Sequence, residues 1–257
     1  MLGWSIARAL PRVIDLTSSS LLTMIRPMKY PGGKGKTFQH VINLMPPHRV
    51  YIETHVGGGA VLRNKLPAER SIAIDADERV MQRLRSDGNE LPPGVELVCA
   101  RAEEFLARYA FRGDELVYAD PPYHPETRRQ RRIYRHEYDA ADHAALLSVL
   151  VALPCKVILS GYAHPLYDEM LPGWRTREFQ AKTHVDVRTE TLWFNFEPPE
   201  ILHDPRHRGD NFRDRQTLKR RLERLQERVH AMDPVERAAF AQWLHTAYPA
   251  ALRSVAP

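Results

Sequence analysis

The chain has 257 residues, of which 43% are hydrophobic, with 37 Lys or Arg against 32 Asp or Glu and a formal net charge of +5. This composition is typical of a globular protein and excludes disordered, collagen-like and disulfide-scaffold chains. The two cysteines, Cys99 and Cys155, are too few for a disulfide framework or a four-cysteine zinc site, so we expect a reducing cytoplasm.

The amino-terminal 24 residues are apolar in part but contain Arg8, Arg12 and Asp15. These charges argue against a secretory signal, and no stretch of the sequence approaches the 18 consecutive apolar residues of a membrane span. We therefore treat residues 1–24 as an extension of unknown role and expect no membrane association.

Short apolar or β-branched runs alternate with helix-length segments from residue 50 onward. The predicted strands are 50–53, 71–75, 95–99, 116–120, 156–160, 176–180 and 191–195. The predicted helices are 60–66, 77–86, 102–109 and 139–153. This rhythm predicts an α/β fold, with a mostly parallel seven-stranded sheet covered by helices on both faces and ligands bound at the carboxyl ends of its strands.

The composition changes after Pro198 and Pro199, where the strand signal ends. Residues 215–230 predict a strongly charged helix and residues 234–248 a more apolar one. We therefore expect a main domain of residues 25–200, followed by a basic helical appendage of residues 201–257.

Positive charge is concentrated in two segments. Residues 124–138 carry a net charge of +3 and residues 203–230 a net charge of +4, which leaves the rest of the chain slightly negative. Such concentration favours a polyanionic partner, although a solvated arginine-rich helix face is the simpler alternative for the tail.

The sharpest motif is Asp120-Pro121-Pro122-Tyr123, at the end of the predicted strand 116–120. Two prolines fix two φ angles and favour extended geometry in the residues before them. The motif therefore predicts a stiff turn that holds a carboxylate, a carbonyl and an aromatic ring in set positions. The alternative is a strand that is merely terminated by prolines.

This turn suits methyl transfer to the exocyclic amine of a nucleobase, whose lone pair is delocalised into the ring. The Asp120 carboxylate and the Pro121 carbonyl can accept its two N–H groups and stabilise the positive charge that develops on nitrogen. Tyr123 can stack on the base, a contact worth about 1–3 kcal/mol. The reaction needs no metal, and His143 and His164, which fit no metal-ligand pattern, are expected to be structural.

Three motifs together resemble the Dam-like, S-adenosylmethionine-dependent N6-adenine DNA methyltransferases of phage and prophage type. They are the catalytic turn, Asp120–Tyr123, the Gly-rich loop that ends in Gly57-Gly58-Gly59 after the first predicted strand, and the segment from Lys29 to Lys34. The resemblance spans residues 26–198. Within this range it includes two segments that follow the catalytic turn, Glu126-Thr127-Arg128-Arg129 and Ser160-Gly161-Tyr162. It implies a Rossmann-like methyltransferase fold, double-stranded DNA as the partner, and transfer of a methyl group from S-adenosylmethionine to adenine N6.

The Gly-rich loop follows the first predicted strand and opens a helix, so its backbone can approach a ligand closely and the helix start favours a carboxylate. The resemblance makes it the cradle for the methionine part of the cofactor. It also assigns the Lys29–Lys34 segment to this pocket. The implied cofactor residues are Tyr30, Gly32, Gly33, Lys34, Glu53, Gly57, Gly58 and Gly59. The family more often has Pro and Phe where Thr54 and His55 stand.

Two acidic positions complete the expected cofactor pocket. Asp75 ends the second predicted strand, where a carboxylate can accept both ribose hydroxyls, whereas Asp77 is better placed as a helix cap. At the end of the third strand the family usually offers an acid for the cofactor's adenine. This chain has Arg101 there, and we expect Glu103 to substitute.

An adenine inside a duplex must flip out to reach such a pocket, and phosphate contacts from basic residues offset that cost. The basic tail from Arg213 to Arg228 is one candidate for these contacts. The other is the loop 124–138, next to the catalytic turn, where we expect DNA contacts from Arg128, Arg129, Arg131, Arg132, Tyr134 and Arg135.

Two alternatives remain. An RNA adenine methyltransferase would use the same chemistry. A DNA-binding relative that has lost its cofactor is suggested by Thr54, His55 and Arg101, but the intact catalytic turn speaks against it.

Overall fold

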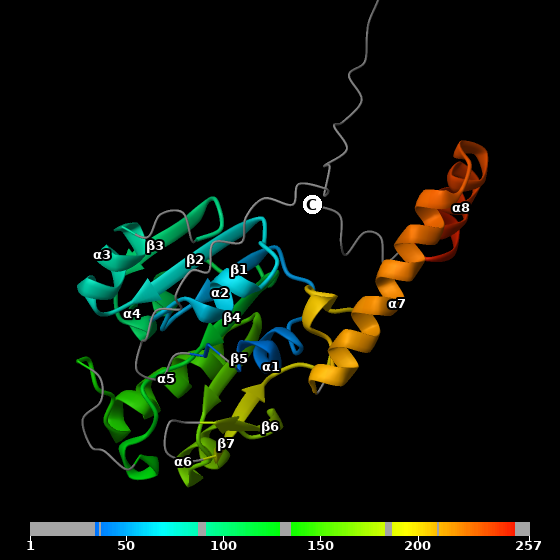
Figure 1. Cartoon of the computed structure of the whole chain (residues 1–257). Helices are drawn as coiled ribbons and strands as arrows, with labels where there is room; N and C mark the ends of the chain where they lie inside the picture. Colours follow the sequence, from blue (N-terminus) through cyan, green and yellow to red (C-terminus); the bar gives the residue numbers. More distant parts are fainter. Residues whose placement is uncertain are drawn as a thin grey trace, which may run out of the picture.

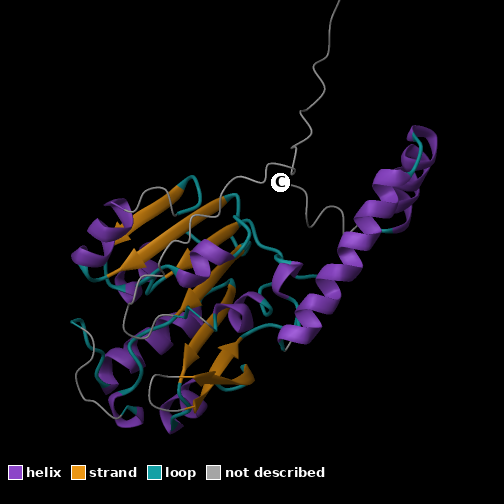
Figure 2. Cartoon of the chain, viewed as in Figure 1, coloured by secondary structure: helices purple, strands orange, loops and turns teal. Residues whose placement is uncertain are grey.

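The computed structural model describes residues 34–35, 37–86, 91–128, 135–182, 187–209 and 211–249. A seven-stranded sheet dominates it, with the strand order β3-β2-β1-β4-β5-β7-β6 (Figures 1 and 2). β1 to β5 run parallel, and β7 is antiparallel to both β5 and β6. The Rossmann-like α/β fold predicted from the sequence is therefore confirmed, with one antiparallel strand, β7, between β5 and the edge strand β6. The predicted extension of residues 1–24 lies outside the described residues.

The observed strands lie within a few residues of the predicted ones. Their bounds are β1 Val50–Glu53, β2 Arg70–Asp75, β3 Val95–Cys99, β4 Glu115–Ala119, β5 Lys156–Gly161, β6 Arg175–Lys182 and β7 Val187–Phe194. The largest corrections concern β6 and β7, which pair along eight residues and so extend beyond the apolar stretches that marked them in the sequence.

Helices cover both faces of the sheet, and their bounds are α1 Phe38–Ile42, α2 Ala60–Asn64, α3 Glu78–Ser86, α4 Ala102–Arg108, α5 Ala140–Ala152 and α6 Pro165–Met170. Asp139 caps α5 as predicted, because its side chain accepts the Asp142 N–H. The predicted helix 60–66 ends early, at Asn64, since Lys65 is extended. α1 and α6 were not predicted, because each is too short to show helical periodicity.

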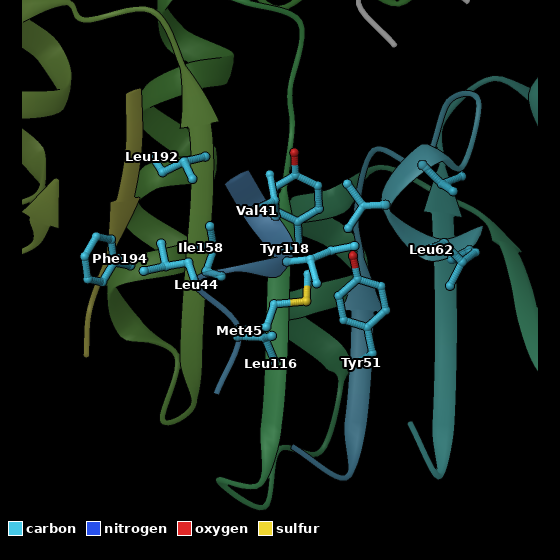
Figure 3. Close-up of a cluster of buried hydrophobic side chains, with 14 of the residues drawn as sticks. Val41, Leu44, Met45, Tyr51, Leu62, Leu116, Tyr118, Ile158, Leu192 and Phe194 are labelled. Atoms are coloured by element: carbon cyan, nitrogen blue, oxygen red, sulfur yellow. The ribbon is translucent and has the colours of Figure 1, made fainter. Parts of the chain in front are cut away.

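Two buried clusters form the core, one on each face of the sheet. Residues of α1, α2 and α3 pack on side chains such as Tyr51, Tyr118 and Ile158 (Figure 3). Residues of α4, α5 and α6 pack on alternate side chains of the same strands, including Ile52 and Val117. Because side chains alternate across a strand, each apolar strand supplies both clusters, and this rigid support fixes the loops at the strand ends.

Two helices follow the sheet, α7 Phe212–Ala231 and α8 Pro234–Ala247. They correspond to the predicted helices 215–230 and 234–248. α7 projects away from the sheet, next to the short 3-10 turn η2 Pro205–His207 (Figure 1). Among the described residues, no helix has the length and apolar character needed to cross a membrane.

Candidate active site

The predicted catalytic turn lies at the point where the strand order of the sheet reverses. β1 and β4 are neighbours, and the connections from them lead to opposite sides of the sheet. Crevices in open α/β sheets form at this position, outside the carboxyl ends of the strands. Glu53 ends β1 and Asp120 directly follows β4, so both carboxyl groups reach the crevice.

The carboxylate of Asp120 is held through one of its two oxygens. Lys34 Nζ and Ser160 Oγ each donate to Asp120 Oδ1 at 2.7 Å. Lys34 comes from the segment before α1, and Ser160 from β5. Because both bonds end on Oδ1, the carboxylate is fixed in orientation while Oδ2 remains an acceptor for a further donor.

The same lysine ties Tyr123 into this network. Lys34 Nζ donates to Tyr123 OH at 2.5 Å, and that hydroxyl donates to Glu190 Oε2 at 3.0 Å. The Tyr123 ring also packs edge-on against Tyr162, with ring centroids 4.5 Å apart. The fourth residue of the turn is therefore buried and fixed in position. It is not among the pocket-lining residues, and the predicted stacking on a base stays a prediction.

Lys34 is a buried cation between two acids. Burial works against its charge, but Asp120, Tyr118 and Glu190 more than compensate, so its pKa is raised and it stays protonated. The paired ammonium makes a charge-assisted hydrogen bond to Asp120 and so fixes the position of this side chain. Glu190 was not singled out in the sequence analysis because it lies on β7 without a local motif.

A pocket extends from the catalytic turn to β2. Of the predicted cofactor residues, Lys34, Glu53, Gly57, Gly58 and Asp75 line it, as do Asp120, Pro121 and Pro122. Residues without a predicted cofactor role also line it, namely His55, Val56, Ala60, Val61, Ala76, Asp77, Arg135, His136 and Tyr138. Gly59 and Glu103 do not line the pocket, and Tyr30, Gly32 and Gly33 lie outside the described residues.

The Gly-rich loop forms a wall of the pocket, held to the end of β2. Gly57 N donates to Asp75 Oδ2 at 3.0 Å, and Asp77 N donates to Asp75 Oδ1 at 2.9 Å. Gly57 and Gly59 have φ angles of 48° and 66°, which glycine adopts without strain. Burial raises the pKa of Asp75, which keeps two backbone bonds and has further lone pairs facing the pocket.

Glu53 is a buried acid at the base of this pocket. Tyr51 OH donates to Glu53 Oε2 at 2.8 Å. Burial, reinforced by the charge of Asp120, raises the pKa of Glu53 to about 8. In the ligand-free protein this side chain is therefore mostly protonated at neutral pH.

The three departures from the family pattern, Thr54, His55 and Arg101, belong to one hydrogen-bonded chain. Thr54 Oγ1 lies 2.8 Å from His55 Nδ1, and His55 Nε2 lies 3.2 Å from Tyr138 OH. Tyr138 OH donates to Glu103 Oε2 at 2.8 Å, and Arg101 Nε donates to Glu103 Oε1 at 2.6 Å. Glu103 is thus occupied by Tyr138 and Arg101, and Tyr138 is the member of this pair that faces the pocket.

The basic loop is described only at its two ends. Arg128, an expected DNA contact, has a side chain that is 3% exposed and pairs with Glu137 at 2.6 Å, so in this structure it does not face solvent. Arg135 is 55% exposed at the rim of the pocket and lies 3.6 Å from Asp77. Arg129, Arg131, Arg132 and Tyr134 lie outside the described residues.

His164, which fits no metal-ligand pattern in the sequence, lies in a group with His124 and Glu126 whose possible metal-ligand atoms are within 4.8 Å of one another. Both imidazole Nδ1 atoms accept backbone N–H bonds, which cap η1 Pro125–Thr127 and α6. Their Nε2 atoms therefore carry the protons in the neutral rings, and His164 Nε2 contacts Glu126 at 3.1 Å. This arrangement fits capping better than metal ligation.

Comparison with protein families agrees with the resemblance found in the sequence. Residues 75–171 match the model of the D12 class N6 adenine-specific DNA methyltransferases. This segment contains the catalytic turn and runs from the end of β2 to the end of α6. No curated protein matches the chain.

Solved structures similar to this chain include methyltransferases of low sequence identity. N-methyltransferase NodS from Bradyrhizobium japonicum WM9 has a TM-score of 0.45 and 10% identity, covering 64% of this chain and 100% of that one. Magnesium protoporphyrin IX methyltransferase from Synechocystis PCC 6803, solved with bound S-adenosylmethionine, has a TM-score of 0.44 and 14% identity, covering 63% and 79%.

Proposed function

We propose that this chain transfers a methyl group from S-adenosylmethionine to the exocyclic N6 amine of an adenine in DNA. The family match supports a methyltransferase that uses S-adenosylmethionine. The choice of DNA and of adenine N6 is supported by the description of that family and by the catalytic turn. The observation that carries the proposal is the position of Asp120, with Oδ1 held by two donors and Oδ2 left to accept a third.

The turn would act on the amine through two acceptors. Asp120 Oδ2 accepts one N6–H and the Pro121 carbonyl accepts the other, which draws nitrogen toward tetrahedral geometry and frees its lone pair. When bound, S-adenosylmethionine supplies an electrophilic methyl group, so an N–C bond forms as a C–S bond breaks. Asp120 stabilises the positive charge on nitrogen until the amine loses its proton to solvent.

The pocket suits the methyl donor in its chemistry. The donor is a sulfonium cation with a ribose and an amino-acid end, and Glu53, Asp75 and Asp120 place three carboxyl groups along the pocket. Gly57 and Gly58 present backbone without side chains, and we assign them to the amino-acid end. We assign Asp75 to the ribose, and Tyr138, held by Glu103 and His55, to the adenine end.

DNA would approach from the side of the pocket where Arg135 is exposed. This places the end of the basic loop next to the catalytic turn, where phosphate contacts can offset the cost of base flipping. Arg128 would act differently, by holding the loop through its buried pair with Glu137.

The proposal is tested by incubating the protein with labelled S-adenosylmethionine and either unmethylated DNA or total RNA, followed by nucleoside analysis. We expect N6-methyladenine in DNA. The Asp120→Ala protein serves as the blank. Label confined to RNA would replace the proposal with an RNA adenine methyltransferase. Tight DNA binding without label in either nucleic acid would favour the cofactor-deficient relative.

A further inference from the structure

The carboxy-terminal helices expose apolar side chains that nothing in the described part of the chain covers. No residue of α7 or α8 is buried, and Leu222 and Leu225 are 41% and 49% exposed. Helices in proteins are stabilised mainly by packing an apolar face against a neighbour. α7 projects away from the sheet (Figure 1), so the sheet does not cover Leu222 and Leu225, and within the chain α8 leaves both of them exposed.

The apolar residues of α7 follow a heptad spacing. Leu218, Leu222, Leu225 and Val229 are separated by four, three and four residues. In heptad notation Leu222 and Val229 occupy a positions, and Leu218 and Leu225 occupy d positions. Leucine at d with a β-branched residue at a favours a parallel two-stranded coiled coil, and Leu225 followed by Val229 has this pattern, whereas Leu222 places leucine at the other a position. Three of these residues, Leu218, Leu222 and Leu225, line a groove together with Arg221, Arg224 and Arg228.

We propose that α7 pairs in parallel with α7 of a second copy of this chain. The charges that flank the heptad seam support this occupant and this orientation. In a parallel pair each g position faces the e position five residues later on the other helix. Asp214 then faces Lys219 of the second copy, twice by symmetry, and Arg221 faces Gln226.

An antiparallel pair would bring the g positions of the two helices together. Arg221 of one copy would then face Arg228 or Arg221 of the other copy, and two like charges repel. Among the described residues, the ion pair of Lys219 is a loose contact with Glu223, at 3.8 Å on an exposed surface, so Lys219 is available to a second helix. The seam therefore selects a parallel homodimer, and this inference does not depend on the proposed function.

DNA is the competing partner, because α7 carries seven Lys or Arg against three Asp or Glu. Phosphates would match those charges but would leave Leu222 and Leu225 in water. A second α7 covers both leucines and leaves the basic residues of the outer face, such as Arg220, in solvent. The exposed seam therefore favours the second copy.

The test is sedimentation equilibrium of the full chain over a concentration series. The expected mass approaches twice the 29.6 kDa of one chain as concentration rises. Leu222→Glu together with Leu225→Glu is expected to give a monomer, whereas Arg220→Glu, on the outer face, is expected to leave the dimer intact. A wild-type chain that stays monomeric, or a dimer that survives both leucine changes, overturns the proposal.

Charge reversal tests the orientation. Lys219→Asp places an acid opposite Asp214 and is expected to weaken the dimer at least tenfold. Adding Asp214→Lys restores the pair with reversed sign, and we expect dimerisation to recover. Failure to recover, with helix content unchanged by circular dichroism, would exclude the parallel register. A monomeric wild-type chain whose DNA binding is lost on reversal of the basic residues would assign α7 to DNA instead.

Discussion

Lys34 Nζ lies 2.7 Å from Asp120 Oδ1, across 86 residues of sequence. The lysine also contacts Glu190 at 3.4 Å, and all three side chains are largely buried. One buried cation therefore orients the carboxylate of the predicted catalytic turn and pairs with both acids.

Replacing Lys34 with Met is expected to reduce both stability and methyl transfer. Removing one partner of a buried ion pair costs about 3–5 kcal/mol, because it leaves an uncompensated charge. We expect a lower midpoint of denaturant unfolding and at least a tenfold loss of kcat. Adding Glu190→Gln removes the stranded acid and should recover part of the stability, but not the activity. A single variant with unchanged stability and turnover would contradict this account.

Tyr138→Phe is expected to weaken S-adenosylmethionine binding while the protein stays folded. The change removes the hydroxyl that connects His55 and Glu103 at the pocket wall, and a hydrogen bond to a charged group contributes about 1.5–3 kcal/mol. Calorimetric titration should show a Kd raised about tenfold or more. Tyr109→Phe is the matched control, since its hydroxyl contacts Arg70 away from the pocket. Equal affinity of the two variants for S-adenosylmethionine would show that Tyr138 does not contribute to the donor site.

The ligand-free protein should lose stability as pH rises from about 4.5 to about 8, through the buried acid Glu53. Its folded-state pKa is raised to about 8 from the ordinary 4.5, so in this interval the folded state holds a proton that the unfolded state has released. The unfolded state is then favoured progressively with pH, and the cost is complete above about 8. Thermal melts of Glu53→Gln should show a smaller decline than wild type. The same decline of melting temperature with pH in the two proteins would show that Glu53 is not the group responsible.

Two arginines at the ends of the basic loop should separate stability from DNA binding. Arg128→Ala breaks a buried ion pair with Glu137 and is expected to lower the melting temperature. Arg135→Ala removes an exposed charge and is expected to weaken DNA binding and flatten its salt dependence, with little change in melting temperature. DNA-binding titrations at several salt concentrations measure the salt dependence of the affinity for each of the two variants. The reverse pattern would move the DNA contact to Arg128.

Local patterns in the sequence were sufficient to predict the sheet and the position of the Asp120-Pro121-Pro122-Tyr123 turn after β4. The apolar runs marked all seven strands, and the two prolines after Asp120 marked the end of β4. Short elements escaped prediction because five or six residues, as in α1 and α6, do not establish a helical period.

The partners of the catalytic turn depend on tertiary contacts. Ser160 lies in a segment that resembles the family, but the sequence does not show its contact with Asp120. The two residues meet because β5, which carries Ser160, pairs with β4, which ends just before Asp120. Glu190 reaches the site because β7 runs antiparallel, which no local motif indicates. Glu103 was expected to face the cofactor, but Arg101 and Tyr138 occupy it.

The central claim is that Asp120 accepts the target amine while other residues hold the methyl donor. It is tested most directly by single-turnover methyl transfer to DNA with Asp120→Ala, alongside titration of S-adenosylmethionine into the same variant. We predict that N6-methyladenine formation is lost while donor affinity changes little. Retained turnover, or loss of donor binding together with activity, would contradict the claim.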